Sequence, residues 1–384
     1  MSSESKKLTQ VTSVVRGLLS QPTDDADNPF EHIILRTLSS GEAVSFASSA
    51  KNADAGQYPE PLVKSDNPPL FLSDTESDKL RDSISKYAKQ YKDNPSIVCL
   101  KDLGILYVEQ SESDSTLPLK NKVAVVTGAA GAIGYGICQG LLESGCRVAA
   151  TDLAGKKLDD FGAELDKSWP GRVISPAIDV TDEDSISRGF ETIIETWGGI
   201  DILVVNAGIP MVSHLIDMDI ETFRKLEKVN IEGAMLTLSA IGRHFISQGI
   251  GGDVIVISTK NVPSPGAGFG GYSATKAACH QLGRIASLEL AQYGVRVNMV
   301  APDAVFEQGK YKSGLWQEIG PDRMKARGLD EKQLQEYYQN RNLLKAKVTG
   351  RHVANAVLFF ATRQTPTTGA TIPVDGGLPD ATPR

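Results

Sequence analysis

Seven short apolar runs recur along the C-terminal two-thirds of the chain, separated by segments with the length and periodicity of helices. The runs cover residues 122–128, 146–152, 172–180, 200–208, 252–258, 295–302 and 371–377. Strands that are apolar throughout are buried on both faces, which is typical of a parallel sheet covered by helices. The sequence therefore predicts an α/β fold with a doubly wound parallel sheet over residues 118–384.

The first 117 residues show a weaker pattern. Residues 1–28 are polar and end in the loop-like stretch QPTDDADNP, so we expect a polar tail there. Residues 29–117 are expected to form a small module, with helical character at 31–38 and 74–92 and one or two short strands within 96–110. A polar stretch at 111–121 that contains Pro118 is expected to link this module to the larger domain.

Charge and cysteine content narrow the functional classes. The 384 residues carry a net charge of −7, which argues against a nucleic-acid or acidic-membrane partner. The four cysteines, Cys99, Cys138, Cys146 and Cys279, form no CxxC pair or His/Cys cluster, so we expect no zinc site and a reducing compartment. Cys138, Cys146 and Cys279 fall in helix or strand patterns and are expected to be small buried residues. No apolar run approaches the roughly 20 residues that span a bilayer, and the N-terminus does not resemble a secretory signal. The expected location is cytoplasmic.

A glycine-rich turn follows the first predicted strand. Gly128, Gly131 and Gly134 lie between that strand and a helical pattern that ends at Gly145. Glycine is needed where backbone approaches a pyrophosphate, and the N-terminus of the following helix attracts phosphate through its free N–H groups. The alternative is an ordinary tight turn, but the position between strand and helix favours a dinucleotide site.

Polar residues close the next three predicted strands. Asp152 ends the second strand, where a carboxylate accepts both ribose hydroxyls of NAD and repels the 2′-phosphate of NADP; the alternative is a helix cap. Lys156 and Lys157 follow and are expected on a solvated helix face. Ligands bind at the C-terminal ends of strands in open α/β sheets. The third and fourth strands end in further candidate cofactor-binding residues: Asp179, Val180, Asn206, Ala207 and Gly208.

Tyr272 and Lys276 are four positions apart in a helical pattern and therefore share one face. An ammonium group about 4 Å from a phenol contributes on the order of 4 kcal/mol at an effective dielectric of 20. That interaction would lower the phenol pKa by up to about three units, to near 7, which suits proton removal from an alcohol. The alternative is an unrelated pair, since Tyr and Lys at this spacing occur on many helices.

Residues 122–384 resemble the classical short-chain dehydrogenase/reductases. The matching motifs, in order, are TGAAGAIG, Asp152, DV, NAG, VNIEG, the Ser-Thr end of the fifth strand, YSATK and VDGG. The resemblance implies that Tyr272 is the general acid/base and that Lys276 lowers its pKa and binds the nicotinamide ribose. It further implies that Asn230 holds a water in a proton relay and that Ile133 and Pro302 contact NAD.

One position departs from the family pattern. The usual catalytic serine aligns by spacing with Thr259, 13 residues before Tyr272, whereas Ser258 lies one position too early. A threonine carries the same hydroxyl and can orient a substrate oxygen, so activity is expected to survive. Thr259 is the preferred candidate. The alternatives are that Ser258 supplies the hydroxyl, or that neither residue does.

A narrower resemblance concerns the region around Tyr272, the segment from Pro302-Asp303 onward and the terminal VDGGLPDATPR. These are similar to the dehydrogenase half of bifunctional rhamnulose-1-phosphate aldolase/lactaldehyde (alcohol) dehydrogenases; sorbitol-6-phosphate 2-dehydrogenases are more distant relatives that also place a lysine where Lys260 stands. Class II aldolases need several histidines for zinc, and of the five histidines only His32 precedes the dehydrogenase-like region. The N-terminal module is therefore expected to be a structural remnant.

The sequence thus predicts an NAD-dependent oxidoreductase that acts on a small sugar, polyol, sugar phosphate or hydroxyaldehyde. Residues 305–347 are expected to cover the substrate, and some of their cations, with Lys260, could hold an anionic substrate group. Trp316 and Tyr337 are expected in packing or at the pocket. Helices at 220–248 and 272–293 suit a homodimer or homotetramer. An NAD-binding pseudoenzyme or scaffold, and a protein whose N-terminal module is the working part, are the alternatives.

Overall fold

The computed structural model describes residues 3–54, 56, 58–109 and 116–379. Its centre is a seven-stranded parallel sheet with the strand order β15-β12-β11-β10-β7-β8-β9. Each strand lies within one of the seven apolar runs, so the predicted fold class is confirmed. In chain order the strands are β7 (Val123–Val126), β8 (Arg147–Ala150), β9 (Val173–Ile174), β10 (Ile202–Val205), β11 (Gly252–Ile257), β12 (Val295–Pro302) and β15 (Thr371–Val374).

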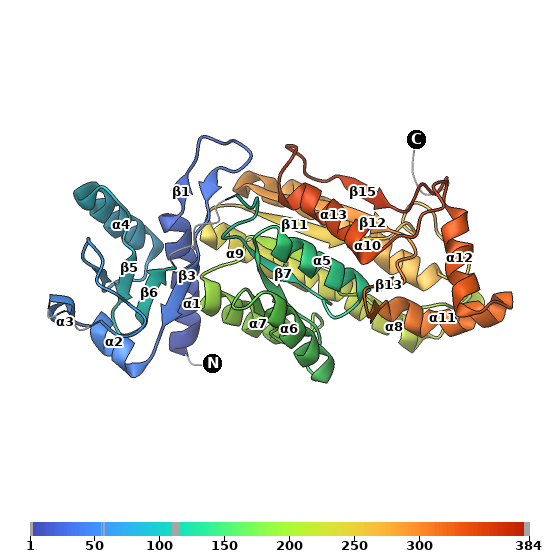
Figure 1. Ribbon diagram of the computed structural model, residues 1–384, viewed down its shortest axis with the longest axis horizontal. Coiled ribbons are helices and arrows are strands. Elements are labelled where there is room, and N and C mark those ends of the chain that lie inside the picture. Colours follow the sequence, from blue (N-terminus) through green and yellow to red (C-terminus); the bar gives the residue numbers. More distant parts are fainter. Residues whose placement is uncertain (1–2, 55, 57, 110–115, 380–384) are drawn as a thin grey trace.

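Helices cover both faces of this sheet (Figure 1). One face packs against α5 (Ala132–Glu143), α6 (Lys156–Ser168) and α13 (Gly350–Ala361), which contribute Ile137, Phe161 and Val353 to a continuous apolar core. The other face packs against α7 (Glu183–Trp197), α9 (Gly233–Gln248) and α10 (Gly270–Leu290), which contribute Phe190, Phe245 and Cys279. Short helical segments complete this layer at η1 (Leu215–Asp217), α8 (Ile220–Glu227), the π-helical η2 (Lys228–Glu232) and η3 (Ala291–Tyr293).

The chain reverses its direction of travel across the sheet between β7 and β10. From β7 it proceeds outward to β8 and β9, then returns to β10 on the other side of β7 and proceeds to β11, β12 and β15. The two loops that leave the carboxyl ends of β7 and β10 therefore diverge and open a crevice between them, which is the usual ligand position in such sheets.

The first helix replaces the polar tail that the sequence predicted. Residues Ser3–Leu19 form α1, which buries Leu8, Val11, Val15 and Leu19. These positions repeat every three or four residues, as an amphipathic helix requires. The helix also packs with polar side chains, since Thr9, Thr12, Ser13 and Arg16 are buried, and this polar composition is why the sequence suggested a tail.

The N-terminal segment also contains a four-stranded sheet of order β3-β6-β5-β4. The structure contradicts the helical character expected at 31–38, because β2 and β3 lie there and β3 pairs with β6; it confirms strands within 96–110 and a helix within 74–92. Residues 110–115 of the expected linker lie outside the described residues. The elements are β1 (Gln21–Pro22), β2 (Phe30–Glu31), β3 (Leu35–Leu38), α2 (Gly41–Ala47), α3 (Ala50–Asp54), β4 (Leu70–Leu72), α4 (Ser77–Tyr91), β5 (Ile97–Leu100) and β6 (Gly104–Val108).

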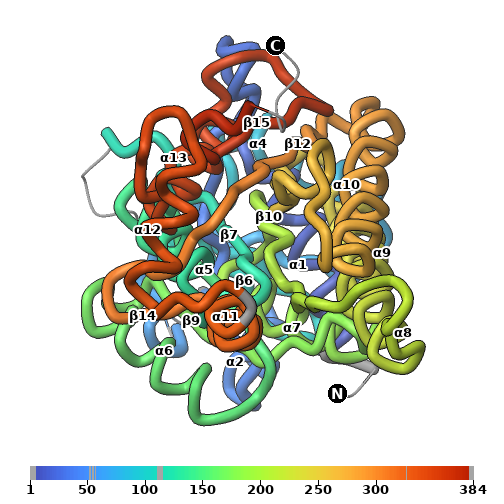
Figure 2. The backbone as a smooth tube through the Cα atoms, turned by 90° about the vertical axis from the view of Figure 1, so that its right-hand side faces the viewer, coloured from blue at the N-terminus to red at the C-terminus, as the bar shows by residue number. Residues whose placement is uncertain are grey.

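The N-terminal segment and the segment between β12 and α13 lie at opposite ends of the molecule (Figure 1). The first contacts α7 and α9 through α1, and Gly17 of α1 approaches Gln248 so closely that a Cβ atom would lie 1.8 Å from its carbonyl oxygen. The second, which we call the lid segment (residues 303–349), carries α11 in front of the strands in Figure 2. Its elements are β13 (Glu307–Gln308), β14 (Tyr311–Lys312), α11 (Gly314–Arg327) and α12 (Glu331–Arg341).

The four cysteines are free and buried, and they include the three whose burial the sequence predicted. Burial raises the pKa of the Cys99 thiol to about 12, which makes this thiol unreactive. Across the described part of the chain, no helix combines the length and the apolar character that a membrane span needs.

Candidate active site

A cavity of about 790 Å³ lies at the carboxyl ends of the central strands, beneath the lid segment. It collects residues from the loops after six of the seven strands. Fourteen of the fifteen site residues expected from the sequence line it, and Asn230 lies behind its wall. The lining residues from that set are Gly128, Gly131, Ile133, Gly134, Asp152, Asp179, Val180, Asn206, Ala207, Gly208, Thr259, Tyr272, Lys276 and Pro302.

The glycine turn after β7 needs glycine at two positions for different reasons. Gly128 has a φ of +60°, and a Cβ atom there would lie 2.8 Å from Cα of Ala207. Gly134 lies in the first turn of α5, where a Cβ atom would approach the carbonyl oxygen of Ala129 to 2.4 Å. A Cβ atom on Gly131 would instead meet open space at the cavity wall. Gly131 therefore leaves room for a ligand, whereas the other two glycines allow the turn itself.

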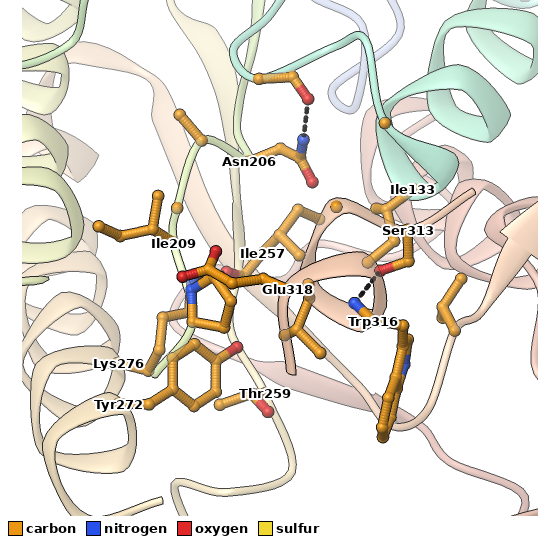
Figure 3. A pocket seen from close by; sticks show the side chains of 18 of the residues that line it. Ile133, Asn206, Ile209, Ile257, Thr259, Tyr272, Lys276, Ser313, Trp316 and Glu318 are labelled. Atoms are coloured by element: carbon orange, nitrogen blue, oxygen red, sulfur yellow. Dashed lines mark hydrogen bonds between the residues drawn. The ribbon is translucent and has the colours of Figure 1, made fainter. Parts of the chain in front are cut away.

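The N-terminus of α5 faces the cavity without a side-chain cap. Its N-cap residue is Gly131, and no side chain accepts from the first backbone N–H groups. Free N–H groups and the positive end of the helix dipole suit a phosphate. The turn is held by Asn206, whose Nδ2 donates to the carbonyl oxygens of Thr127 and Gly128 at 3.0 and 2.8 Å (Figure 3). The loops of the two diverging strands are thus fixed to each other.

Asp152 lies at the cavity wall after β8. Its carboxylate accepts from the backbone N–H groups of Ala130 and Leu153, at 3.0 and 2.9 Å. Each oxygen retains a further lone pair for a ribose hydroxyl. Lys156 is paired with Asp160 on the surface and Lys157 is exposed, as expected for a solvated helix face, and Lys157 also lines the cavity. Together with the glycine turn, this donor and acceptor set fits a nicotinamide dinucleotide.

The side chains of Tyr272 and Thr259 lie next to each other at the cavity, with Lys276 on the same helix face as Tyr272 (Figure 3). The Thr259 hydroxyl is near enough to act on the pKa of the phenol, which it lowers. Nζ of Lys276 donates to the carbonyl oxygen of Ile257 at 2.6 Å, so that the β11 backbone fixes the ammonium group. A phenol, a hydroxyl and an ammonium group are thereby presented to one space.

The acidity expected for Tyr272 was wrong for this structure. Burial raises the pKa of the phenol to about 12, and the Thr259 hydroxyl opposes this only in part. Sequence reasoning considered the nearby ammonium group but not the removal of the phenol from water. Because Lys276 donates to Ile257, its charge is also shared with a backbone carbonyl.

The two candidate catalytic hydroxyls have different partners. Oγ of Ser258 lies 2.9 Å from Nδ1 of His280, on α10. Thr259 instead meets Tyr272, and its Oγ1 also accepts from the backbone N–H of Asn261 at 3.3 Å. Both residues line the cavity, but only the Thr259 hydroxyl is arranged to act with the phenol.

Asn230 lies in the π-helical turn between α8 and α9 and is 2% exposed. Its Oδ1 accepts from the backbone N–H of Ile209 at 2.9 Å, and its Nδ2 donates to the Ile209 carbonyl at 3.0 Å. The same Nδ2 donates to Oγ1 of Thr275 at 3.1 Å. The side chain therefore braces the loop after β10 against α10, which positions Tyr272 and Lys276 next to that loop.

The lid segment supplies cavity residues that sequence reasoning did not single out individually. Trp316 stacks on Phe306 with ring centroids 4.3 Å apart and also lines the cavity, so it serves both in packing and at the pocket. Tyr337 is 40% exposed and lies outside the lining, whereas its neighbour Tyr338 lines the cavity. Further lining residues from this region and from the loops beside it are Phe269, Asp303, Glu318, Arg323, Arg327 and Arg341. Their helical spacing alone gave no signal that they face inward.

Comparison with known proteins also indicates a protein that binds a nicotinamide dinucleotide. The sequence model of the short chain dehydrogenase family matches residues 122–313. The chain is 32% identical to an uncharacterized oxidoreductase, YuxG, of Bacillus subtilis over 68% of this chain and 38% of that protein's length. It is also 32% identical to glucose 1-dehydrogenase of Gluconobacter oxydans, over 67% of this chain and 91% of that enzyme.

Among solved structures, sorbitol-6-phosphate 2-dehydrogenase from Erwinia amylovora is similar, with a TM-score of 0.61 and 28% identity. The similarity covers 66% of this chain and 98% of that enzyme. The family model ends before β15, whereas the two relatives and the solved structure each match about two-thirds of this chain. The parallel sheet, the glycine turn and the Tyr272–Lys276 pair therefore belong to a member of the short-chain dehydrogenase family.

Proposed function

We propose that this protein is an NAD-dependent dehydrogenase that interconverts a hydroxyl and a carbonyl on a small polyhydroxylated substrate. The observation that carries the proposal is that Tyr272, Thr259 and Lys276 line one cavity, which begins at an uncapped helix N-terminus and at Asp152. One end of the cavity suits a dinucleotide and the other a hydroxylated compound.

The proton chemistry follows from the side chains in the cavity. When bound, the dinucleotide accepts or supplies the hydride. In the oxidation direction, Tyr272 accepts the proton of the substrate hydroxyl, and in the reduction direction it returns a proton to the new alkoxide oxygen. The Thr259 hydroxyl holds the same substrate oxygen in reach of the phenol. Lys276 places a fixed positive charge beside the site, which favours the phenolate form during the transfer.

The preference for NAD over NADP rests on Asp152. A carboxylate at the end of β8 binds two ribose hydroxyls and repels a ribose phosphate. Lys157, which lines the same part of the cavity, acts in the opposite sense. Asp152 is held by two backbone N–H groups, whereas no hydrogen bond among the described residues fixes Lys157, so we propose that the carboxylate determines the choice.

We propose that residues 29–117 are a structural remnant and not an aldolase. His32, the single histidine of this region, is bound through Nδ1 to Asp201 at 2.9 Å and is 9% exposed at its side chain. It is therefore committed to packing rather than to a zinc ion.

We also propose that the protein forms a homodimer or homotetramer, because the outer faces of α9 and α10 expose Met235, Ile246, Ile285 and Leu288.

The test is an absorbance screen for NADH formation with the full chain against polyols, sugars, sugar phosphates and hydroxyaldehydes. Turnover with at least one of these classes, and its loss in Tyr272→Phe with dinucleotide binding retained, supports the proposal. Tyr293→Phe is the matched control, since Tyr293 is 44% exposed and lies outside the cavity lining. Dinucleotide binding without turnover across the screen would instead favour an NAD-binding scaffold, and no dinucleotide binding would contradict both.

A further inference from the structure

The end of the cavity beneath α11 and α12 carries more cations than carboxylates. Its cationic lining residues are Lys260, Arg323, Arg327 and Arg341, and its carboxylates are Asp303 and Glu318. Arg341 forms an ion pair with Asp303 at 2.7 Å, so the charges of these two residues offset each other. Among the described residues, no carboxylate lies within ion-pair distance of the other three cations. Glu318 and Arg327 are both exposed, so the lining of this end carries an excess of positive charge whether or not both are counted.

Arg323 and Tyr272 both pack near Phe269. Its guanidinium group lies over the ring of Phe269, 4.2 Å from the centroid. The Phe269 ring centroid is in turn 6.2 Å from that of Tyr272. One aromatic ring therefore separates Arg323 from the phenol, so a substrate that reaches Tyr272 passes close to the guanidinium.

Arg323 has a buried N–H group without a hydrogen-bond acceptor in the described part of the chain. Its Nε is buried and has no hydrogen-bond partner among the described residues, and the same holds for Nε of Arg341. Stacking on an aromatic ring occupies the face of a guanidinium and leaves its N–H edge available. Buried donors in proteins are nearly always satisfied, so an arginine held for packing alone would have an acceptor. The edge of Arg323 is arranged for an oxyanion.

Two other cations, Arg327 and Lys260, line the same end of the cavity as Arg323. The guanidinium of Arg327 lies over the ring of Tyr337, 4.9 Å from its centroid, one helical turn after Arg323 on α11. Lys260 leaves the loop after β11 and donates to the carbonyl oxygen of Ser264 at 3.2 Å, which leaves two of its three N–H groups. Three cations without a carboxylate partner match a group with more than one negative charge. A phosphate monoester carries about −1.5 to −2 at pH 7, whereas a carboxylate carries a single charge.

We propose that Arg323, together with Arg327 and Lys260, binds a phosphate monoester on the substrate, so that the hydroxyl oxidised at Tyr272 belongs to a phosphorylated polyol or sugar. This inference rests on the proposed dehydrogenase function and specifies its substrate class. Phe269 and Tyr338 act as positioning residues, since each holds an arginine of the cavity by its ring face.

The experiment compares the dissociation constants of matched neutral and phosphorylated ligands by titration calorimetry, using the full chain with saturating NADH. The probes are sorbitol and sorbitol 6-phosphate, glycerol and glycerol 3-phosphate, with gluconate as the carboxylate ligand. We expect at least one phosphorylated ligand to bind about 10- to 100-fold more tightly than its neutral partner, the range of a charge-assisted hydrogen-bond set. Arg323→Gln should bring that ratio close to one, and Arg323→Lys should retain part of it.

Lys325→Gln is the matched control, because it removes one charge from the same helix at an exposed position outside the cavity lining. It should keep the wild-type ratio. A ratio near one for both pairs in the wild type, or an unchanged ratio in Arg323→Gln, would overturn the inference. Tighter binding of gluconate than of every phosphorylated ligand would also overturn it, in favour of a carboxylate. Turnover of neutral polyols without a phosphate preference would leave the dehydrogenase function intact, whereas failure to bind any dinucleotide would contradict that function itself.

Discussion

Arg16 and Asp201 form a buried ion pair that joins the first helix of the chain to the start of a central strand. The two terminal nitrogens of Arg16 bond the two carboxylate oxygens at 2.9 and 2.7 Å, and both side chains are at most 2% exposed. Asp201 also accepts from His32 and from the backbone N–H of Val123 at the start of β7. The N-terminal segment is therefore attached by hydrogen bonds at the end of the sheet opposite the cavity.

Replacement of Arg16 by leucine should strongly destabilise the protein. Removing one partner of a buried ion pair leaves the other charge unpaired, which costs about 3–5 kcal/mol. The guanidinium also donates to the Ile33 carbonyl, so the variant would lose a further contact between α1 and the segment after β2. Urea unfolding of wild type and Arg16→Leu measures the difference.

The matched control for that measurement is Arg243→Leu, because Arg243 pairs with Glu183 at the surface, with both side chains more than 60% exposed. Exposed pairs contribute little. Equal unfolding midpoints for wild type and Arg16→Leu would show that the N-terminal segment is not part of the cooperative unit.

Stability should fall in mild acid because of His244. Burial lowers the pKa of this imidazole from 6.5 to about 4. Its Nε2 lies 3.0 Å from the backbone nitrogen of Ile200 and 3.1 Å from Oε1 of Gln248. In the unfolded chain His244 takes up a proton below about pH 6.5, whereas in the folded chain it does so only near pH 4. The contribution of the neutral ring is therefore complete above pH 6.5 and is lost as the pH falls through the folded value, by up to roughly 3 kcal/mol.

The measurement is the free energy of unfolding at pH 7.5 and pH 4.5. His244→Gln retains an acceptor for Ile200 and should show a smaller decrease than wild type. His32, whose pKa burial also lowers, is present in both proteins and contributes equally. His214→Gln at an exposed position serves as the control and should behave as wild type. An identical acid dependence in His244→Gln would contradict this assignment.

The central sheet could be predicted because its strands are apolar throughout and short, which leaves few alternatives. The N-terminal segment was harder for a physical reason. Leu35 and its neighbours gain their strand conformation from pairing with β6, a partner about 70 positions away, and the local sequence carries no trace of that pairing. The first helix was missed although its apolar spacing is visible, because its most informative buried residue is charged: Arg16 reads as surface until Asp201 is placed beside it.

The candidate site divides in the same way. Gly128, Asp152 and Tyr272 were identifiable because backbone geometry and motif spacing constrain the residue type at each position. The lid arginines were not, since an arginine on a solvated helix and one that stacks on Phe269 have the same sequence signature. The prediction of a low pKa for Tyr272 was wrong for a related reason, because the burial of the phenol depends on how the lid segment and α10 enclose it.

Thr259, rather than Ser258, should supply the catalytic hydroxyl. Thr259→Ala removes the hydroxyl that lies beside the phenol and should lower kcat/KM by about 10²-fold, the effect of losing one donor to a reacting oxygen. Thr259→Ser restores the hydroxyl and should recover most of the rate. Ser258→Ala should change kcat/KM far less, because that hydroxyl is engaged with His280. A larger loss in Ser258→Ala than in Thr259→Ala would reverse the assignment.

The two reaction directions should differ in their pH dependence. With the pKa of Tyr272 raised to about 12, the phenolate that accepts a proton from an alcohol increases about tenfold per pH unit from 7 to 10. The phenol that donates in carbonyl reduction is the main form over this whole range. We therefore expect kcat/KM for oxidation to rise with pH and that for reduction to be nearly constant, measured with one substrate pair in both directions. A plateau of the oxidation rate near pH 7 would instead indicate the lower pKa expected from the sequence.

Asp152 should make NAD the preferred dinucleotide, and its replacement by serine should reduce that preference. In the wild type the carboxylate repels a ribose 2′-phosphate, so we expect kcat/KM to be at least about 10-fold higher with NAD than with NADP, a difference of 1.4 kcal/mol. In Asp152→Ser the repulsion disappears while Lys157 remains at the cavity wall to attract the phosphate, so the ratio should fall below one. Asp159→Ser, an exposed carboxylate on α6, is the control and should keep the wild-type ratio. A wild-type preference for NADP would contradict this prediction and would indicate that the ammonium group of Lys157 outweighs the carboxylate, in which case Lys157→Ala, with Asp152 retained, should shift the preference to NAD.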